Sequence, residues 1–341
     1  MGVLIGGGII IKEKILMVFT GGTIQSDIKN NSIDVSDNNK YLLLDMYNKQ
    51  ENKKEIEFDI ISPISILSEN ATVEDWTAIV NSIKEKELLK YKGIIITYGT
   101  DTLGYFANAL SYLLYDIEIP VMIVSDNFVL TDKRSNGLDN FSTAVNFIIQ
   151  KNYNGVFVSF KNYNGQIYIH KGTRVKQIAQ LATSVYSIYD DYFAQVIDGE
   201  IIEKKKDNIE YVQEGKYKFN IGKDVLYIKP VVGMKYNFML DGYRAVFHES
   251  FHTNAIPKDA INLVKECNER GILFFIGTMF DEGRTLYKET SEAVKEGAII
   301  IQNMSLEAII SKLMIATGTF NTNEEIKEFM SKNIIGEFIT L

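Results

Sequence analysis

Two apolar segments of this chain each run into a short turn of glycine and threonine. Residues 15–19 (Ile-Leu-Met-Val-Phe) are followed by Thr20-Gly21-Gly22-Thr23, and residues 93–97 (Gly-Ile-Ile-Ile-Thr) by Tyr98-Gly99-Thr100-Asp101. A continuous apolar run of this length is typical of a buried parallel strand. Glycine allows a sharp backbone turn and the close approach of a ligand at the strand end. The pattern therefore predicts an open α/β sheet with a ligand site at its carboxyl edge, where hydroxyls of Thr20 and Thr23 are presented.

The rest of the chain alternates strand-like with helix-like segments, which indicates parallel α/β organisation. We expect helices at residues 72–87, 103–115 and 140–150, the first opened by a capping box of Thr72 and Asp75. The most charged and least periodic stretch lies near residues 203–218. We therefore predict a larger N-terminal domain with a mainly parallel sheet flanked by helices (13–205), a linker (206–222) and a smaller C-terminal α/β domain (223–341). Further strands are expected at residues 56–61, 121–125, 156–160, 225–228, 245–247, 272–276 and 299–301.

Composition argues against several classes of partner. The net charge is −8, and no concentrated positive field is present to bind nucleic acid. No stretch reaches the ~18 uninterrupted apolar residues of a membrane span. The single cysteine, Cys267, excludes an intramolecular disulfide and fits a small core residue of a helix. Residues 1–11 lack a basic region and a cleavage site, so we expect no signal peptide and a cytoplasmic protein.

Hydroxyl and carboxylate groups gathered at one sheet edge suggest nucleophilic chemistry. Amide hydrolysis needs a nucleophile, a group that helps deprotonate it, and donors for the developing oxyanion. Threonine hydroxyls at two strand ends, with Asp101 beside them, could supply part of this set. The simpler alternative for Thr23 is a strand-end threonine in a tight glycine turn.

The two turns resemble the signature segments TGGTI and HGTDT of the L-asparaginase/glutaminase family. The first is intact at residues 20–24, and the second reads YGTDT, with Tyr98 in place of histidine. The likeness extends over roughly residues 13 to 320. It includes a substrate-binding loop at residues 68–70, a strand at 120–124, and a final strand, turn and helix at 297–308.

This resemblance implies that Thr23 attacks a side-chain amide to form an acyl-enzyme. Thr100 would belong to a second catalytic group with Asp101 and a lysine, and Asp101 would also receive the substrate's α-ammonium. We expect no cofactor. Members of the family are commonly homotetramers built from tight dimers. We therefore expect a small amino-acid amide as substrate and a homo-oligomer, either a dimer or a tetramer.

Three positions depart from the family pattern. The family lysine falls nearest Gln177 by spacing, and Lys176 is one residue away, which on a strand would turn it to the opposite face. Lys176 can serve only if a bulge or loop restores its direction. Tyr98 keeps a hydroxyl but loses imidazole chemistry. The family's mobile loop carries a catalytic tyrosine; here residues 25–40 contain none, the first candidate is Tyr41, and the polar composition predicts a flexible lid.

The resemblance also implies substrate-binding positions. Ser68 would bind an α-carboxylate, Glu69 would favour an α-ammonium by its charge, and Tyr98 would contribute a hydroxyl. Asn254 matches a family asparagine contributed across a subunit interface, and Glu289 lies near a family glutamate of similar use. For Glu69 the alternative is a solvated turn acid, and for Asn254 the closing of a turn.

A different class of protein must also be weighed. His248-Glu249-Ser250-Phe251-His252 fits the H-E-x-x-H pattern of zinc peptidases, with Glu269 as a conceivable third ligand. That chemistry needs both histidines on one helical face, whereas here the pattern leaves a strand and enters a turn. We therefore expect no metal. The remaining alternatives are a diverged enzyme acting on another amide, and a homologue that binds an amino acid without turnover.

Overall fold

The computed structural model shows two compact units, Met1–Lys205 and Lys206–Leu341. It describes residues 4–5, 8–9, 12–29, 31–36, 39–150, 153–204, 217–279 and 285–339. The predicted domains, 13–205 and 223–341, stay a prediction, because most of their linker, 206–222, lies outside the described residues. No helix in these ranges has the length and apolar character that crossing a bilayer requires.

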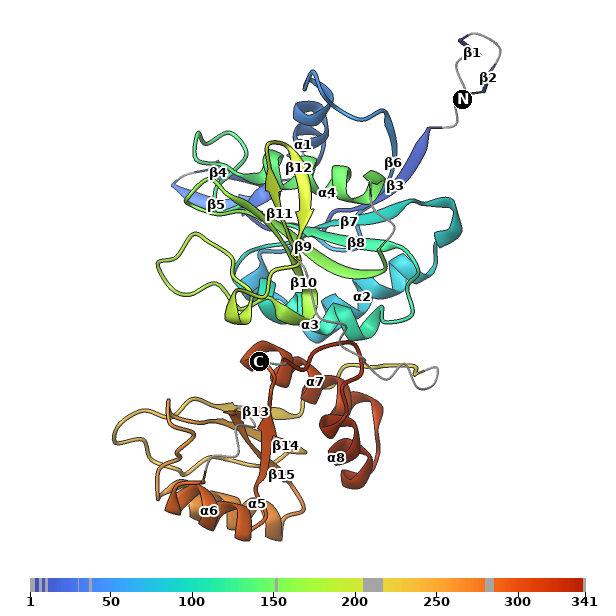
Figure 1. Cartoon of the computed structure of the whole chain (residues 1–341). Coiled ribbons are helices and arrows are strands. Elements are labelled where there is room, and N and C mark those ends of the chain that lie inside the picture. The colour runs from blue at the N-terminus through green and yellow to red at the C-terminus, as the bar shows by residue number, and fades with distance from the viewer. Residues whose placement is uncertain are drawn as a thin grey trace. The chain divides into compact units, whose positions relative to one another are not determined.

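The first unit is built on an eight-stranded sheet in the order β12-β11-β10-β9-β8-β7-β3-β6 (Figure 1). Five neighbouring strands, β9, β8, β7, β3 and β6, are parallel to one another. The strands β10, β11 and β12 extend the sheet beyond β9, each antiparallel to its neighbour. The central strands are fully buried apolar runs, as expected for a sheet covered on both faces. The strands are β3 (Glu13–Val18), β6 (Ile56–Ile61), β7 (Gly93–Thr97), β8 (Pro120–Val124), β9 (Gly155–Lys161), β10 (Ile167–Lys171), β11 (Ala194–Ile197) and β12 (Glu200–Glu203).

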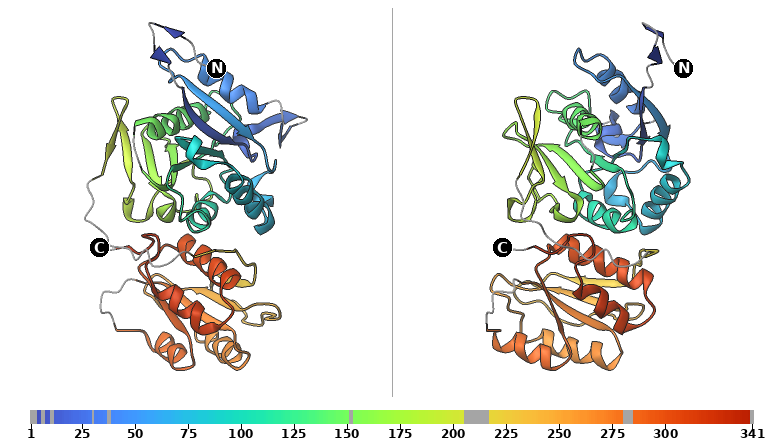
Figure 2. Two further views of the ribbon diagram at one scale, coloured as in Figure 1. Left: turned by 90° about the vertical axis from the view of Figure 1, so that its right-hand side faces the viewer. Right: turned by 45° about the vertical axis from the view of Figure 1, so that its right-hand side comes forward.

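Helices cover both faces of this sheet. Figure 2 shows the layers from two further sides: α1 (Asn39–Asn48) and α4 (Gly137–Gln150) pack on one face, with α2 (Val73–Lys84) and α3 (Leu103–Leu113) on the other. The predicted capping box of Thr72 and Asp75 is confirmed at the start of α2. A short antiparallel pair, β1 (Leu4–Ile5) and β2 (Gly8–Ile9), precedes the sheet.

The segment after the first glycine turn is a β-hairpin. β4 (Ser26–Lys29) and β5 (Ser32–Val35) pair antiparallel, so the segment predicted to be a flexible lid contains a hairpin, and its flexibility stays a prediction. Period-two alternation explains the pairing, because Ile28 and Ile33 face each other across the strands. Tyr41 lies beyond the hairpin on α1 and is 62% exposed.

The second unit is a four-stranded parallel sheet in the order β13-β14-β15-β16. Cys267 lies on α5 and is fully buried in the core that this sheet forms with α5 and α6, as predicted. Together the two units confirm the expected fold class. The elements are β13 (Val225–Ile228), β14 (Ala245–Glu249), α5 (Ala260–Glu269), β15 (Leu273–Met279), α6 (Lys288–Lys295), β16 (Ile299–Gln302), α7 (Leu306–Thr319) and α8 (Asn323–Ser331).

A buried ion pair ties the segment after α8 to the helices of this unit. Lys312 on α7 lies 2.6 Å from the Glu337 carboxylate, and both side chains are 0% exposed. Glu337 also accepts backbone N–H groups of Ile334 and Ile335, so its charge is neutralised and its oxygens are hydrogen-bonded. Such a pair is costly to break singly, because the remaining charge would be buried alone.

Candidate active site

The two glycine–threonine turns meet at the carboxyl ends of neighbouring strands. β3 and β7 are parallel and adjacent, and each turn follows its strand directly. A Cβ on Gly22 would lie 2.6 Å from the backbone nitrogen of Gly99, so the turns are in backbone contact. Gly22 also has φ +78°, which glycine adopts readily. The predicted convergence of the two motifs is confirmed. Thr23 and Thr100 each directly follow one of the two glycines in this contact.

A buried hydrogen-bond network holds the first turn. The Gln25 side-chain oxygen accepts from the Gly21 N–H at 2.6 Å and from the Thr97 hydroxyl at 2.8 Å. The Thr20 hydroxyl donates to the Thr97 carbonyl. Thr20 is 1% exposed, so the expectation that the turn presents both its threonine hydroxyls is wrong for Thr20. This threonine joins β3 to β7.

Ser68 connects a third loop to the second turn. It begins a 3-10 turn, Ser68–Asn70, and its hydroxyl oxygen accepts the Asp101 N–H at 3.2 Å. The Thr102 hydroxyl donates to the Ser68 carbonyl at 3.0 Å. Ser68 is 2% exposed, whereas its neighbour Glu69 is exposed on the same turn. The loop predicted to bind substrate therefore lies directly against Asp101.

Tyr98 lies beneath the second turn. Its hydroxyl accepts from the Trp76 indole at 2.8 Å and lies 2.9 Å from the Thr102 hydroxyl, and its ring stacks on Phe106 at 3.9 Å. Burial raises the pKa of Tyr98 to about 12, and only 1% of the residue is exposed. The predicted substrate contact of Tyr98 does not fit this geometry, because the hydroxyl is already bonded inside the protein.

Lys176 lies on a loop and not on a strand, so its one-residue shift from the family lysine position does not by itself turn the side chain to an opposite face. Residues Gly172–Arg174 form a 3-10 turn and residues 176–179 are irregular, so the alternation of a strand does not apply. A Cβ on Gly104 would lie 3.0 Å from the carbonyl carbon of Lys176, which places this loop against the start of α3. Gln177 carries the hydrogen bonds of this contact, to Gly104 N–H, Thr100 O and Asp101 O. Sequence reasoning missed this role for Gln177.

The predicted catalytic side chains differ from their scaffold in one respect. Thr23 and Thr100 are partly exposed, and Asp101 and Lys176 are exposed. Within the described ranges, no hydrogen bond or ion pair involves the two hydroxyls, the Asp101 carboxylate or the Lys176 ammonium. By contrast, Thr20, Gln25, Ser68 and Tyr98 are buried and hydrogen-bonded within the protein. Two hydroxyls and a carboxylate at the turns, and an ammonium on the neighbouring loop, are therefore available to a ligand.

Asn254 belongs to the second unit, where it closes a turn. Its φ is +63°, its N–H donates to the Phe251 carbonyl at 2.9 Å, and its carbonyl accepts from the Thr290 hydroxyl at 3.1 Å. Glu289 lies in the first turn of α6. These contacts satisfy the backbone N–H and carbonyl of Asn254. They do not involve its side chain, which can therefore contact a ligand or another subunit.

The H-E-x-x-H segment has no helical geometry. His248 lies in strand β14, is 0% exposed, and its Nε2 is 2.8 Å from the Tyr236 hydroxyl. Burial lowers the pKa of His248 to about 4. His252 lies in the turn that follows and is exposed, and Glu269 ends α5. In the part of the chain that the structure describes, no three His, Cys, Asp or Glu side chains are arranged to hold a metal ion.

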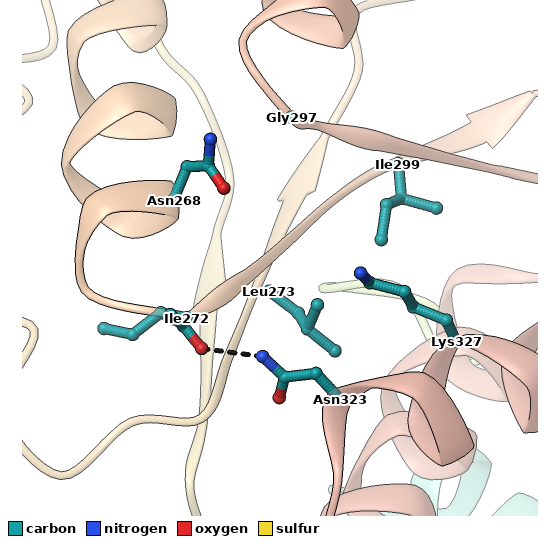
Figure 3. Close-up of a pocket in the computed structure, with 8 residues that line it drawn as sticks. Asn268, Ile272, Leu273, Gly297, Ile299, Asn323 and Lys327 are labelled. Carbon is teal, nitrogen blue, oxygen red and sulfur yellow. Dashed lines mark hydrogen bonds between the residues drawn. The ribbon is translucent and has the colours of Figure 1, made fainter.

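A cavity of about 270 Å³ lies in the second unit at the amino ends of β15 and β16 (Figure 3). Asn254 follows the carboxyl end of the neighbouring strand β14, so the cavity lies at the opposite edge of this sheet. The Asn323 side-chain amide donates a hydrogen bond to the Gly271 carbonyl at 2.8 Å. A dashed line from Asn323 marks this bond in Figure 3. The lining residues are Asn268, Gly271, Ile272, Leu273, Gly297, Ile299, Asn323 and Lys327.

Comparison with known families identifies the family of this chain. The family model described as "Asparaginase, N-terminal" matches residues 14–210, more than half of the chain and the whole of the region that carries both turns. The chain therefore belongs to the asparaginase family, and it is an amidohydrolase.

Individual relatives extend the likeness over both units. An L-asparaginase of Thermococcus kodakarensis is 28% identical over 336 residues, covering 95% of this chain and 98% of the relative. A solved structure, the thermostable L-asparaginase from Thermococcus kodakarensis, has a TM-score of 0.79 and 25% identity over 96% of this chain and all of that one. A glutamyl-tRNA(Gln) amidotransferase subunit of Methanococcus maripaludis is 27% identical, covering 80% of this chain and 68% of the relative.

Proposed function

We propose that this enzyme hydrolyses the side-chain amide of asparagine or a closely related amino acid through an acyl-enzyme on Thr23. The observation that carries the proposal is the backbone contact of the two turns, which brings Thr23, Thr100 and Asp101 to one sheet edge, with the loop of Lys176 packed against the start of α3. The Thr23 hydroxyl oxygen attacks the amide carbonyl, the C–N bond breaks, and ammonia leaves with the proton of the hydroxyl. Water then cleaves the ester and restores Thr23.

The other residues support this reaction. We assign proton transfer during attack to Thr100 with Lys176, whose positive charge favours the ionised form of a neighbouring hydroxyl. Asp101, an exposed carboxylate, pairs with the α-ammonium of the substrate. Ser68 accepts the Asp101 N–H through its oxygen and so keeps its own proton to donate to an α-carboxylate. Glu69, on the same turn, adds negative charge toward the α-ammonium.

Ammonia release tests this function. The purified enzyme is supplied with asparagine, glutamine and succinamate, an amide without an α-ammonium. Thr23→Val keeps the β-branched shape and should lower turnover by at least about a thousandfold, since a covalent path is lost. Thr23→Ser, the matched control, keeps a hydroxyl and should retain measurable activity. Equal rates for wild type and Thr23→Val would refute the mechanism.

The same assay separates the alternatives. Turnover of another amide but not asparagine would indicate a redirected amidohydrolase, and binding without ammonia release an amino-acid-binding homologue. The relatives that are glutamyl-tRNA(Gln) amidotransferase subunits raise a third outcome, in which ammonia is passed to a partner protein. Release of free ammonia by the isolated chain at full rate would argue against it.

We also propose that Asn254 completes the site of a neighbouring subunit, which requires at least a dimer. Asn254→Ala should then lower activity without changing the unfolding of the first unit. Light scattering that shows an active monomer at the assay concentration would contradict this assembly.

We also propose a cytoplasmic location. It is in keeping with a Campylobacter jejuni structure of the same fold, described as a probable cytoplasmic L-asparaginase.

A further inference from the structure

We propose that Gln177 is a positioning residue, which fixes the Thr100–Asp101 turn and at the same time joins it to the loop of Lys176. The expected effect on catalysis rests on the proposed function. The expected effect on the structure of the turn rests only on the hydrogen bonds of Gln177. The Gln177 carboxamide makes three hydrogen bonds to backbone groups of one turn: it accepts the Gly104 N–H at 3.1 Å and donates to Thr100 O at 3.1 Å and Asp101 O at 2.8 Å.

The acceptor half of this carboxamide replaces a missing helix cap. The first N–H groups of an α-helix have no partner within the helix and are usually satisfied by the side chain of the N-cap residue. Thr102 is the N-cap of α3 but makes no such bond, because its hydroxyl donates to Ser68 O and contacts the Tyr98 hydroxyl. Gln177, distant in sequence, supplies the acceptor for Gly104 N–H instead.

The donor half acts on the turn itself. Thr100 O and Asp101 O belong to the peptide groups that follow the two proposed functional residues. Holding both carbonyls restricts rotation of these peptide planes and therefore the directions in which the Thr100 and Asp101 side chains leave the backbone. On the other side, the Ser68 hydroxyl accepts Asp101 N–H at 3.2 Å. The turn is thus bonded from two loops that are far apart in sequence.

The same contact places Lys176. Gly104 has no side chain, and a Cβ there would lie 2.6 Å from Gln177 N and 2.8 Å from its Cα. The loop can therefore approach α3 only because residue 104 is glycine. Since Lys176 is the preceding residue, docking of Gln177 sets where the Lys176 backbone lies relative to Thr100. Gln177 joins the two parts of the proposed second catalytic group.

Three variants divide the role of the carboxamide. Gln177→Glu keeps an acceptor for Gly104 N–H but sets a carboxylate against two carbonyls. Gln177→Lys keeps donors but removes the acceptor, and Gln177→Met removes both. Gln180→Met is the matched control, because Gln180 is exposed on the same loop. Displacements of about 1 Å in a catalytic group can cost a hundredfold, so we expect kcat to fall about ten- to hundredfold in Gln177→Met and Gln177→Glu, with no change in Gln180→Met.

Two readouts distinguish positioning from general destabilisation. The first is the ratio of kcat/KM for asparagine over succinamate, which should fall in Gln177→Met because Asp101 no longer meets the α-ammonium correctly. The second is hydrogen exchange at the Gly104 amide, which should accelerate in Gln177→Met and Gln177→Lys but stay protected in Gln177→Glu. An unchanged ratio and unchanged exchange in Gln177→Met would overturn the proposal. If wild-type enzyme releases no ammonia, the proposed function fails, and the exchange pattern alone still decides whether Gln177 holds the turn.

Discussion

Gly99 and Ser68 are packed so closely that each constrains the other. A Cβ on Gly99 would lie 2.3 Å from the Ser68 hydroxyl oxygen and 2.6 Å from its Cβ, distances that real contacts do not show. Gly99→Ala should therefore displace Ser68 and lengthen its hydrogen bond to Asp101 N–H. The effect is steric, since Gly99 does not adopt a positive φ.

The expected magnitudes follow from these contacts. Overpacking by one methyl group costs about 1–3 kcal/mol, which we assign to Gly99→Ala. Ser68→Gly loses one hydrogen bond, about 1 kcal/mol, and gains unfolded-state freedom worth about 0.5–1 kcal/mol. In the double variant the clash is relieved, because the Ser68 Oγ and Cβ atoms are gone and the next nearest atom, Ser68 N, lies at 3.3 Å. The double variant should be about as stable as Ser68→Gly alone, a favourable coupling of about 1–3 kcal/mol.

Trp76 provides the assay. It is the only tryptophan of the chain, it lies in the first unit, it is 7% exposed, and its indole donates to the Tyr98 hydroxyl next to Gly99. Denaturant unfolding followed by Trp76 fluorescence therefore reports on this unit and not on the second. If the two destabilisations simply add in the double variant, the steric explanation is wrong.

Three further predictions concern charge. Asp101→Asn should raise KM for asparagine about tenfold or more and leave succinamate unaffected, measured by ammonia release, because only the first substrate has an α-ammonium. Burial lowers the pKa of His170 to about 3, so below pH 6.5 the unfolded chain binds a proton on this histidine that the folded protein does not. The free energy of unfolding, followed by Trp76 fluorescence, should therefore fall by up to about 1.4 kcal/mol per pH unit as the pH drops toward 4. The fall should be less steep in His170→Gln. Lys312→Met should cost about 3–5 kcal/mol by calorimetry, and Lys312→Met with Glu337→Gln should recover most of it.

Much of the fold and the outline of the site follow from local pattern. The apolar runs before Gly21 and Gly99 identify buried strands, and parallel order then brings their ends together. The hairpin at residues 26–35 was harder to predict, because its strands are short and mostly polar, with only Ile28 and Ile33 as an apolar pair.

Tertiary contacts account for the rest. The direction of Lys176 depends on a 3-10 turn that strand alternation does not describe. The roles of Gln177 and Trp76 depend on partners distant in sequence, which no motif of this chain encodes. The presence of Tyr98 where the family has histidine is explained by tertiary contacts, because its hydroxyl is hydrogen-bonded to Trp76 and Thr102 beneath the turn.

The position of the Lys312–Glu337 pair also bears on how the protein is made. Glu337 follows Lys312 by 25 residues, yet it is the counterion for that lysine in the interior of the second unit. When α7 first leaves the ribosome, Glu337 is still inside the exit tunnel, so Lys312 has no buried partner and α7 cannot settle into its final packing. The first unit ends at residue 205 and emerges before either member of the pair. The two units should therefore fold in succession during synthesis, the second only once Glu337 has emerged.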